Sequence, residues 1–119
     1  MPKEDMNPIV NANGTQYWYQ DGKFHRDDGP AVIFANGDQF WYQNDQKHRD
    51  DGPAEIYANG DQIWYQNGDL HRDDGPAVIY ADGDQVWYLA NIEYSFDTWL
   101  ELNKSISKEE KVMYKLEFA

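Results

Sequence analysis

The chain has 119 residues and no cysteine, so a disulfide framework and a thiolate metal site are both excluded. Its 22 acidic and 10 basic residues give a formal net charge of −12, a balance that is typical of disordered chains. However, the sequence contains 5 Trp, 9 Tyr and 5 Phe, which are residue types that disordered segments lack. We therefore expect one ordered unit that is stabilised by aromatic contacts.

The first ten residues contain no apolar stretch long enough for a secretory signal, and no later segment approaches the length of a membrane span. We therefore expect a soluble protein with a cytoplasmic location.

An internal repeat of 23 residues dominates the rest of the chain. Its markers are the aromatic residues Trp18, Trp41, Trp64 and Trp87, and the segment His-Arg-Asp-Asp-Gly-Pro recurs at the same interval. Full copies fill residues 13–81, and half-copies lie on both sides of them. A fixed period of this length is the signature of a repeat array, so we expect a hairpin array over residues 1–94.

Each unit contains a first turn signal, Asn36-Gly37 in one copy, with Asn59-Gly60 and Asp82-Gly83 as its equivalents. Such pairs favour a two-residue type I′ hairpin turn, which would place Val32 opposite Trp41. One face would then hold the core, with Ile33, Phe40, Tyr42, Ile56, Ile63, Tyr65, Ile79, Val86 and Tyr88. The other face would hold Trp41 and the Val32 position. Because Glu55 occupies that position in the next copy, we expect the second face to be partly solvated.

A second turn signal, Asp21-Gly22 or Asn67-Gly68, leads into the His-Arg-Asp-Asp-Gly-Pro-Ala segment, which we call the corner. Gly29 is expected to take a backbone conformation that is closed to other residues, and Asp27 or Asp28 to accept hydrogen bonds from turn N–H groups. The corner is thus interpreted as a structural element. Its polar residues are His25, Arg26, Asp28, His48, Arg49, Asp51, His71, Arg72 and Asp74.

After Tyr94 the repeat stops and a helical pattern begins. Ser95 is expected to cap a helix bearing Phe96, Trp99 and Leu100, and residues 107–110 have the form of a capping box for a second helix bearing Val112, Met113 and Leu116. Residues 95–119 should therefore form a helical cap over the last hairpin. The predicted fold is all-β, a single-layer antiparallel meander of hairpins closed by this cap.

The period, the aromatic pair and the hairpins punctuated by glycine resemble MORN (membrane occupation and recognition nexus) repeats. The residues that carry the resemblance are Trp64-Tyr65-Gln66-Asn67-Gly68 and His71-Arg72-Asp73-Asp74-Gly75-Pro76-Ala77, within residues 8–94. They are similar to a MORN-like family of phages, large DNA viruses and bacteria. The resemblance implies a scaffold whose surface residues select the partner. The usual Tyr-x-Gly-x-Trp opening is replaced by Trp-Tyr, so the resemblance does not carry a lipid-related role.

Metal binding and catalysis are both disfavoured by the repeat. Equivalent side chains in neighbouring units should lie about 9 to 10 Å apart, whereas metal ligands converge to about 2 Å from the ion. His25, His48 and His71 therefore cannot share a metal, although a site within one unit from His25, Asp27 and Asp28 stays conceivable. The serines lie only near the C-terminus, at Ser95, Ser105 and Ser107, and no unit places a nucleophile beside a base. We predict no enzyme activity, no metal and no cofactor.

The negative charge belongs to the array. Residues 14–95 contain 15 acidic and 5 basic residues, a net charge of −10. Such a surface is repelled by nucleic acids and by anionic membranes, so we expect a protein partner with a basic surface. Four hairpins at about 4.8 Å per strand would carry about half the charge density of duplex DNA. Mimicry of nucleic acid is one interpretation of this charge, and simple solubility is the other.

The predicted function is therefore that of a non-catalytic, acidic interaction module, for instance a phage-encoded inhibitor that acts in the host cytoplasm on a nucleic-acid-binding protein. The alternatives are a scaffolding array and an antitoxin-like partner of a bacterial toxin. The Trp residues offer large rigid areas for a partner, although repeated aromatic residues also stack between units. The candidate partner contacts are Asp38, Asp61, Asp84, Trp41, Trp64 and Glu55.

Overall fold

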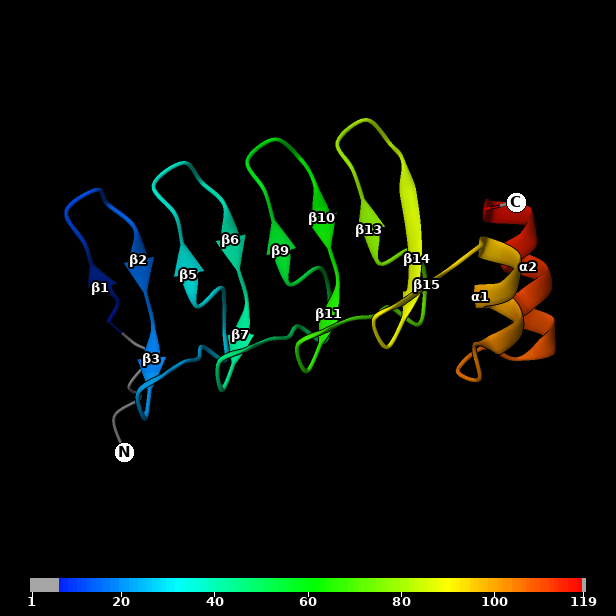
Figure 1. Ribbon diagram of the computed structural model, residues 1–119, viewed down its shortest axis with the longest axis horizontal. Helices are drawn as coiled ribbons and strands as arrows, with labels where there is room; N and C mark the ends of the chain where they lie inside the picture. Colours follow the sequence, from blue (N-terminus) through cyan, green and yellow to red (C-terminus); the bar gives the residue numbers. More distant parts are fainter. Residues whose placement is uncertain (1–6, 119) are drawn as a thin grey trace.

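The computed structural model describes residues 7–118. The chain forms a row of antiparallel hairpins in a single layer, and two helices lie at the C-terminal end of the row (Figure 1). The hairpins and the helices together measure 48 × 33 × 20 Å along their principal axes. This architecture confirms the predicted all-β meander with a helical cap.

Within residues 7–118, nine short strands form the continuous sheet, in which every neighbouring pair is antiparallel and the order follows the chain. In that order they are β1 (Ile9–Val10), β2 (Gln16–Tyr17), β5 (Val32–Ile33), β6 (Gln39–Phe40), β9 (Glu55–Ile56), β10 (Gln62–Ile63), β13 (Val78–Ile79), β14 (Gln85–Leu89) and β15 (Ile92–Tyr94). In Figure 1 the turns that join β5 to β6, β9 to β10 and β13 to β14 stand along the top of the row, and we call them the upper turns.

A second set of hairpins lies along the bottom of the row, and we call these the lower hairpins. They are β3 (Tyr19–Gln20) with β4 (Lys23–Phe24), β7 (Tyr42–Gln43) with β8 (Gln46–Lys47), and β11 (Tyr65–Gln66) with β12 (Asp69–Leu70). Their two-residue turns have positive φ at both positions, for example 53° at Asp21 and 78° at Gly22. Asn44 and Asp45 adopt the same turn with φ of 50° and 67°, although neither residue is a glycine. The second turn signal is therefore confirmed.

The upper turns differ from the prediction by one residue. Phe34 N donates to Asp38 O at 2.9 Å, and Gly37 N donates to Phe34 O at 2.9 Å, so residues 35–37 form a three-residue loop. Gly37 takes a φ of 99°, the left-handed position that such a loop requires. Val32 consequently pairs with Phe40, and Ile33 pairs with Gln39. The predicted two-residue turn, with Val32 opposite Trp41, was wrong.

This shift in register changes which residues share a face. Ile33 and its equivalents leave the predicted core and lie on the face of Gln39, while Val32 joins Phe40 on the opposite face. Ring contacts within and between units connect the residues of that opposite face, including Phe24 with Tyr42 at 5.2 Å and Phe40 with Tyr57 at 5.5 Å between centroids. We call it the aromatic face, and it includes Tyr17, Tyr19, Phe24, Phe34, Phe40, Tyr42, Tyr57 and Tyr65.

Glu55 lies on the aromatic face and is only 2% exposed, so the prediction of a solvated position was wrong. Its carboxylate forms an ion pair with Lys47 Nζ and accepts a hydrogen bond of 3.0 Å from the Tyr57 hydroxyl. Burial raises the pKa of Tyr57, and the negative charge of Glu55 raises it further. Burial alone would lower the pKa of Lys47, but the hydrogen bond and charge of Glu55 outweigh burial and raise it.

The cap consists of α1 (Phe96–Leu102) and α2 (Lys108–Phe118). As predicted, Ser95 caps α1 by accepting from Thr98 N at 3.2 Å. The capping box of α2 is also confirmed, with Ser107 N donating to Glu110 Oε1 at 3.0 Å and Glu110 N to Ser107 Oγ at 3.1 Å. The Glu110 carboxylate is favoured by hydrogen bonding to the Ser107 backbone N–H and, to a smaller extent, to the Ser107 side chain, and both interactions lower the pKa of Glu110.

Aromatic residues join the cap to the array. Trp87 packs with Trp99, Leu100 and Ile106, and Tyr114 and Phe118 of α2 lie against this cluster. As predicted, α2 bears Val112, Met113 and Leu116, but it packs against the array through Tyr114 and Phe118 and leaves these three aliphatic side chains in solvent. The exposed side chains are Val112 at 58%, Met113 at 63% and Leu116 at 76%.

Candidate functional site: the acidic corners

Each corner is held by the same internal bonds. In the first, His25 Nε2 lies 2.8 Å from Asp27 Oδ1, Arg26 Nε donates to Asp28 Oδ1 at 3.1 Å, and Arg26 Nη1 donates to the carbonyl of Pro30 at 3.2 Å. The same bonds recur in the corners that begin at His48 and His71. Asp27 and Asp28 thus accept from side chains of their own corner.

The arginine of each corner lies over the ring of the tryptophan of its unit. The guanidinium carbon of Arg26 is 3.9 Å from the ring centroid of Trp18, and the distances for Arg49 over Trp41 and Arg72 over Trp64 are 4.0 and 3.9 Å. Such contacts between a cation and an aromatic ring stabilise by about 0.5 to 2 kcal/mol, depending on solvent exposure.

The glycine of each corner makes room for this arginine. A Cβ atom on Gly29 would lie 3.0 Å from the guanidinium carbon of Arg26, and one on Gly75 would lie 2.7 Å from that of Arg72. Gly29 does not have a positive φ, so the conformation expected from the sequence was wrong. A glycine suits this position because the arginine packs against its backbone.

The histidine of each corner ties one unit to the next. His25 Nδ1 accepts from Asn44 N at 3.1 Å, His48 Nδ1 from Asn67 N at 3.0 Å, and His71 Nδ1 from Ala90 N at 2.9 Å. Because Nδ1 is the acceptor, the neutral ring carries its proton on Nε2, where it donates to the aspartate. Each histidine therefore bridges its own corner and the next hairpin turn along the row, which for His71 is the turn between β14 and β15.

In the first two corners, backbone carbonyls accept hydrogen bonds from the unit that follows. In the third corner, side chains of the cap donate to the backbone carbonyls instead. Gln43 and Gln66 donate from Nε2 to the carbonyls of Arg26 and Arg49, at 3.1 and 2.9 Å. Leu89 occupies the equivalent position in the last unit and cannot donate. The carbonyl of Arg72 instead accepts from Trp99 Nε1 at 3.1 Å, and Asn103 Nδ2 donates to the carbonyl of Asp73 at 2.7 Å.

While its histidine and arginine point into the array, each corner presents its two aspartates to solvent. The exposed side-chain fractions are 79%, 87% and 75% for the residues paired with arginine, Asp28, Asp51 and Asp74. The residues paired with histidine, Asp27, Asp50 and Asp73, are 62%, 86% and 53% exposed. Six carboxylates thus form a ladder along one side of the row.

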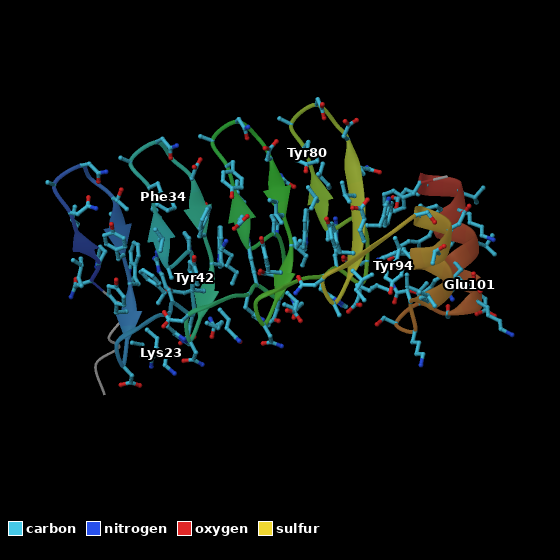
Figure 2. All side chains as sticks on the ribbon, viewed as in Figure 1. Lys23, Phe34, Tyr42, Tyr80, Tyr94 and Glu101 are labelled. Carbon is cyan, nitrogen blue, oxygen red and sulfur yellow. The ribbon has the colours of Figure 1, made fainter. Side chains whose placement is uncertain are left out.

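Grooves separate successive corners. The groove between the first two corners has a volume of about 690 Å³, and its walls include Asp27, Asp28, Asp50 and Asp51, with Trp41 also contributing to the lining. The next groove, of about 630 Å³, repeats this arrangement around Trp64. Figure 2 shows the labelled Lys23 and Tyr42 in the lower part of the row, and Phe34 and Tyr80 toward the upper turns. The array therefore offers open grooves at regular intervals, each lined by the four aspartates and the two arginines of the corners on either side.

The aspartates predicted as partner contacts have different surroundings. Asp38 Oδ1 accepts from Ala58 N at 2.7 Å, and Asp61 Oδ1 accepts from Ala81 N at 2.7 Å, so each ties its upper turn to the next one. Both are half-buried, whereas Asp84 at the end of the row is exposed. The structure does not bring these residues together with the predicted Trp41 and Trp64, which are half-buried near the corners.

Sequence reasoning missed two features of the site. Glu55 is covered by its neighbours, so we do not include it in a partner surface. Asp27, Asp50 and Asp73 belong to the exposed ladder, although the sequence-based list of corner residues included only the second aspartate of each corner. The Asp-Asp pair in the sequence could have indicated that both aspartates belong together, because the histidine and the arginine that precede them can each bind one of the two carboxylates.

Other kinds of site find little support in the described part of the chain. Within residues 7–118, no group of three or more His, Asp or Glu side chains is placed to hold a metal ion. No helix among those residues is long and apolar enough to cross a membrane. A scan of protein-family models finds no match to the chain, and a search of curated proteins finds none either. The resemblance to MORN-like repeats therefore stays a prediction.

Proposed function

We propose that this protein is a non-catalytic interaction module that binds a basic protein surface through its corner aspartates. The observation that carries the proposal is the ladder of six carboxylates, all more than half exposed, on a frame of bonded histidines and arginines. A rigid frame lowers the entropic cost of binding because its side chains are already held in place.

The corners stay negative in spite of their internal pairing. With its histidine neutral, each corner holds two carboxylates and one guanidinium, a net charge of −1. Equivalent corners should lie about 9.6 Å apart, since two strands of about 4.8 Å separate them. Lysine or arginine side chains of a partner would enter the grooves and meet carboxylates from two corners at once.

The proposal extends to inhibition of a protein that binds nucleic acid. Such proteins carry basic surfaces that follow a line of phosphates, and a linear ladder of carboxylates offers charges of the same sign in a similar arrangement. Its charge density is lower than that of duplex DNA, so competition with nucleic acid should require a molar excess of this protein.

The experiment measures binding of the fluorescently labelled protein to a linker histone, chosen as a basic DNA-binding probe, by anisotropy over a range of salt concentrations. We expect binding that weakens steeply with salt, and unlabelled duplex DNA should displace the protein. Binding that is insensitive to salt, or an absence of binding to basic probes at low salt, would count against the proposal.

A further inference from the structure

Two contacts join each upper turn to the next along the row. In the second unit, Gln39 and Phe40 of β6 pair with Ile56 and Glu55 of β9, and Asp38 accepts from Ala58 N. In the third unit, Gln62 and Ile63 of β10 pair with Ile79 and Val78 of β13, and Asp61 accepts from Ala81 N. The same combination of a strand pair and an aspartate bond is thus used twice.

The C-terminal end of the sheet offers an open strand edge and an aspartate, which are one side of a further contact of this kind. Gln85 and Val86 pair with β13 on one side, while β15 pairs only with residues 87–89 of β14. Within residues 7–118, no strand pairs with Gln85 and Val86 on the side away from β13. Asp84, which corresponds to Asp38 and Asp61, is exposed there. In Figure 1 the upper turn between β13 and β14 rises above α1 and α2.

The N-terminal end of the sheet offers the other side of this contact, which is a strand with an open edge and an alanine N–H. Among the strands of residues 7–118, β1 pairs with β2 alone, and its residues Ile9 and Val10 are 58% and 60% exposed. These residues stand at the positions of Glu55 and Ile56 in the repeat, and Ala12 stands at the position of Ala58. An open strand edge of this kind is a ready template for another strand.

Because these two sides match, we propose that the two ends of the sheet bind each other between copies of the chain, so that molecules stack head to tail. Val10 of one copy pairs with Gln85 of its neighbour, Ile9 pairs with Val86, and Ala12 N donates to Asp84. The occupant of each end is therefore a second copy of this protein. Because the contact joins two different surfaces, each bound copy leaves one free end for the next, and we expect linear oligomers.

The charge of the protein sets the conditions under which this contact forms. Each copy carries a net charge of −12, and copies brought end to end repel each other over distances of about a Debye length. The strand pairing joins apolar and amide side chains, and Asp84 binds an uncharged backbone N–H, so no ion pair holds the contact. Salt therefore reduces the repulsion between copies more than it weakens the contact. Self-association should therefore increase with salt, opposite to the behaviour expected for a basic partner. The two proposals can consequently fail independently.

The test is sedimentation velocity of the full-length protein in about 1 M NaCl, where the Debye length is about 3 Å, and again at low salt. At high salt we expect species larger than a dimer whose share rises with protein concentration. Two charge-neutral double variants block one end each: Ile9→Lys/Val10→Asp at the N-terminal end, and Asp84→Ala/Gln85→Asp at the C-terminal end. Circular dichroism confirms that each variant is folded.

Each blocked variant should be monomeric alone, and an equimolar mixture should form dimers and nothing larger, because only one pair of free ends remains. Ile92→Lys, on the exposed strand β15, is the control and should oligomerise like the natural chain. The proposal is overturned if the natural protein stays monomeric at every salt concentration. It is also overturned if the variant blocked at Asp84 and Gln85 still forms dimers, since that result indicates symmetric pairing of β1 with β1.

Discussion

The half-buried Lys47 forms an ion pair with the buried Glu55, at two positions that hold only hydrocarbon side chains in the neighbouring units. Phe24 and Leu70 correspond to Lys47, while Val32 and Val78 correspond to Glu55. The pair lies across the second corner, and Lys47 Nζ also lies 5.0 Å from the ring centroid of Phe40 and 5.2 Å from that of Tyr65. One unit of the array thus uses an ion pair where the others use apolar packing.

Breaking this ion pair should cost more than replacing it. Lys47→Leu leaves the Glu55 carboxylate, which is 2% exposed, without its cation, and we expect a loss of about 3 to 5 kcal/mol in the free energy of unfolding. The double variant Lys47→Leu/Glu55→Val restores the side chains of the third unit and should lie within about 1 kcal/mol of the natural protein or above it. Urea denaturation measures both, and a double variant as unstable as the single one would contradict the interpretation.

The same region predicts a loss of stability at alkaline pH. The folded-state pKa values of Lys47 and Tyr57 are both raised, so the folded protein holds these protons more tightly than the unfolded chain. Their stabilising contribution is therefore complete below the ordinary values of about 10 and is lost as the pH rises above them. The urea midpoint should fall between about pH 9 and about pH 11, and it should fall less in the variant Lys47→Leu/Glu55→Val. An equal fall in both proteins would contradict this assignment.

Alanine at the corner glycines should loosen the stack of arginine on tryptophan. At Gly75 the new Cβ would lie 2.7 Å from the guanidinium carbon of Arg72, closer than the 3.0 Å at Gly52, so Gly75→Ala should be the more damaging change. We expect a cost of about 1 to 3 kcal/mol, the usual range for overpacking. Thermal denaturation compares the two variants, and equal stability of Gly75→Ala and the natural protein would contradict the proposed role of the glycine.

The indole N–H of Trp99 should contribute separately from its ring. Trp99→Phe keeps an aromatic ring against Trp87 but leaves the carbonyl of Arg72 without the donor that the cap supplies, at a cost of about 1 to 3 kcal/mol. Trp99→Ala removes the packing as well and should cost about 3 to 5 kcal/mol. Chemical denaturation separates the two effects, and a Phe variant as stable as the natural protein would show that the hydrogen bond is dispensable.

The sequence was sufficient to predict the array, its lower turns and the caps of both helices, because period, turn residues and capping residues act locally. The sequence was insufficient where the length of a turn or the burial of a side chain depends on contacts with a neighbouring unit. Asn36-Gly37 fits a loop of either two or three residues, and the adjoining Asp38 bonds across to the next turn. Glu55 was misplaced because its cation is supplied from the other side of the corner.

The candidate site was predicted only in part for a similar reason. The corner was correctly located in the sequence, but its bonding pattern decides which groups face solvent. His25 and Arg26 turn inward to bind the next lower turn and Trp18, and this leaves Asp27 and Asp28 at the surface. Asp38 appeared equally available from the sequence, yet the structure uses its carboxylate between two upper turns.

Two triple variants with equal charge give the most direct test of the corner ladder. One is Asp28→Asn/Asp51→Asn/Asp74→Asn, and the other is Asp38→Asn/Asp61→Asn/Asp84→Asn; asparagine keeps an acceptor oxygen in both. Binding to a linker histone at low salt should weaken at least about tenfold, or about 1.4 kcal/mol, in the corner variant and much less in the turn variant. Equal weakening in both would show that only net charge matters, and would contradict the proposal that the corners form the binding surface.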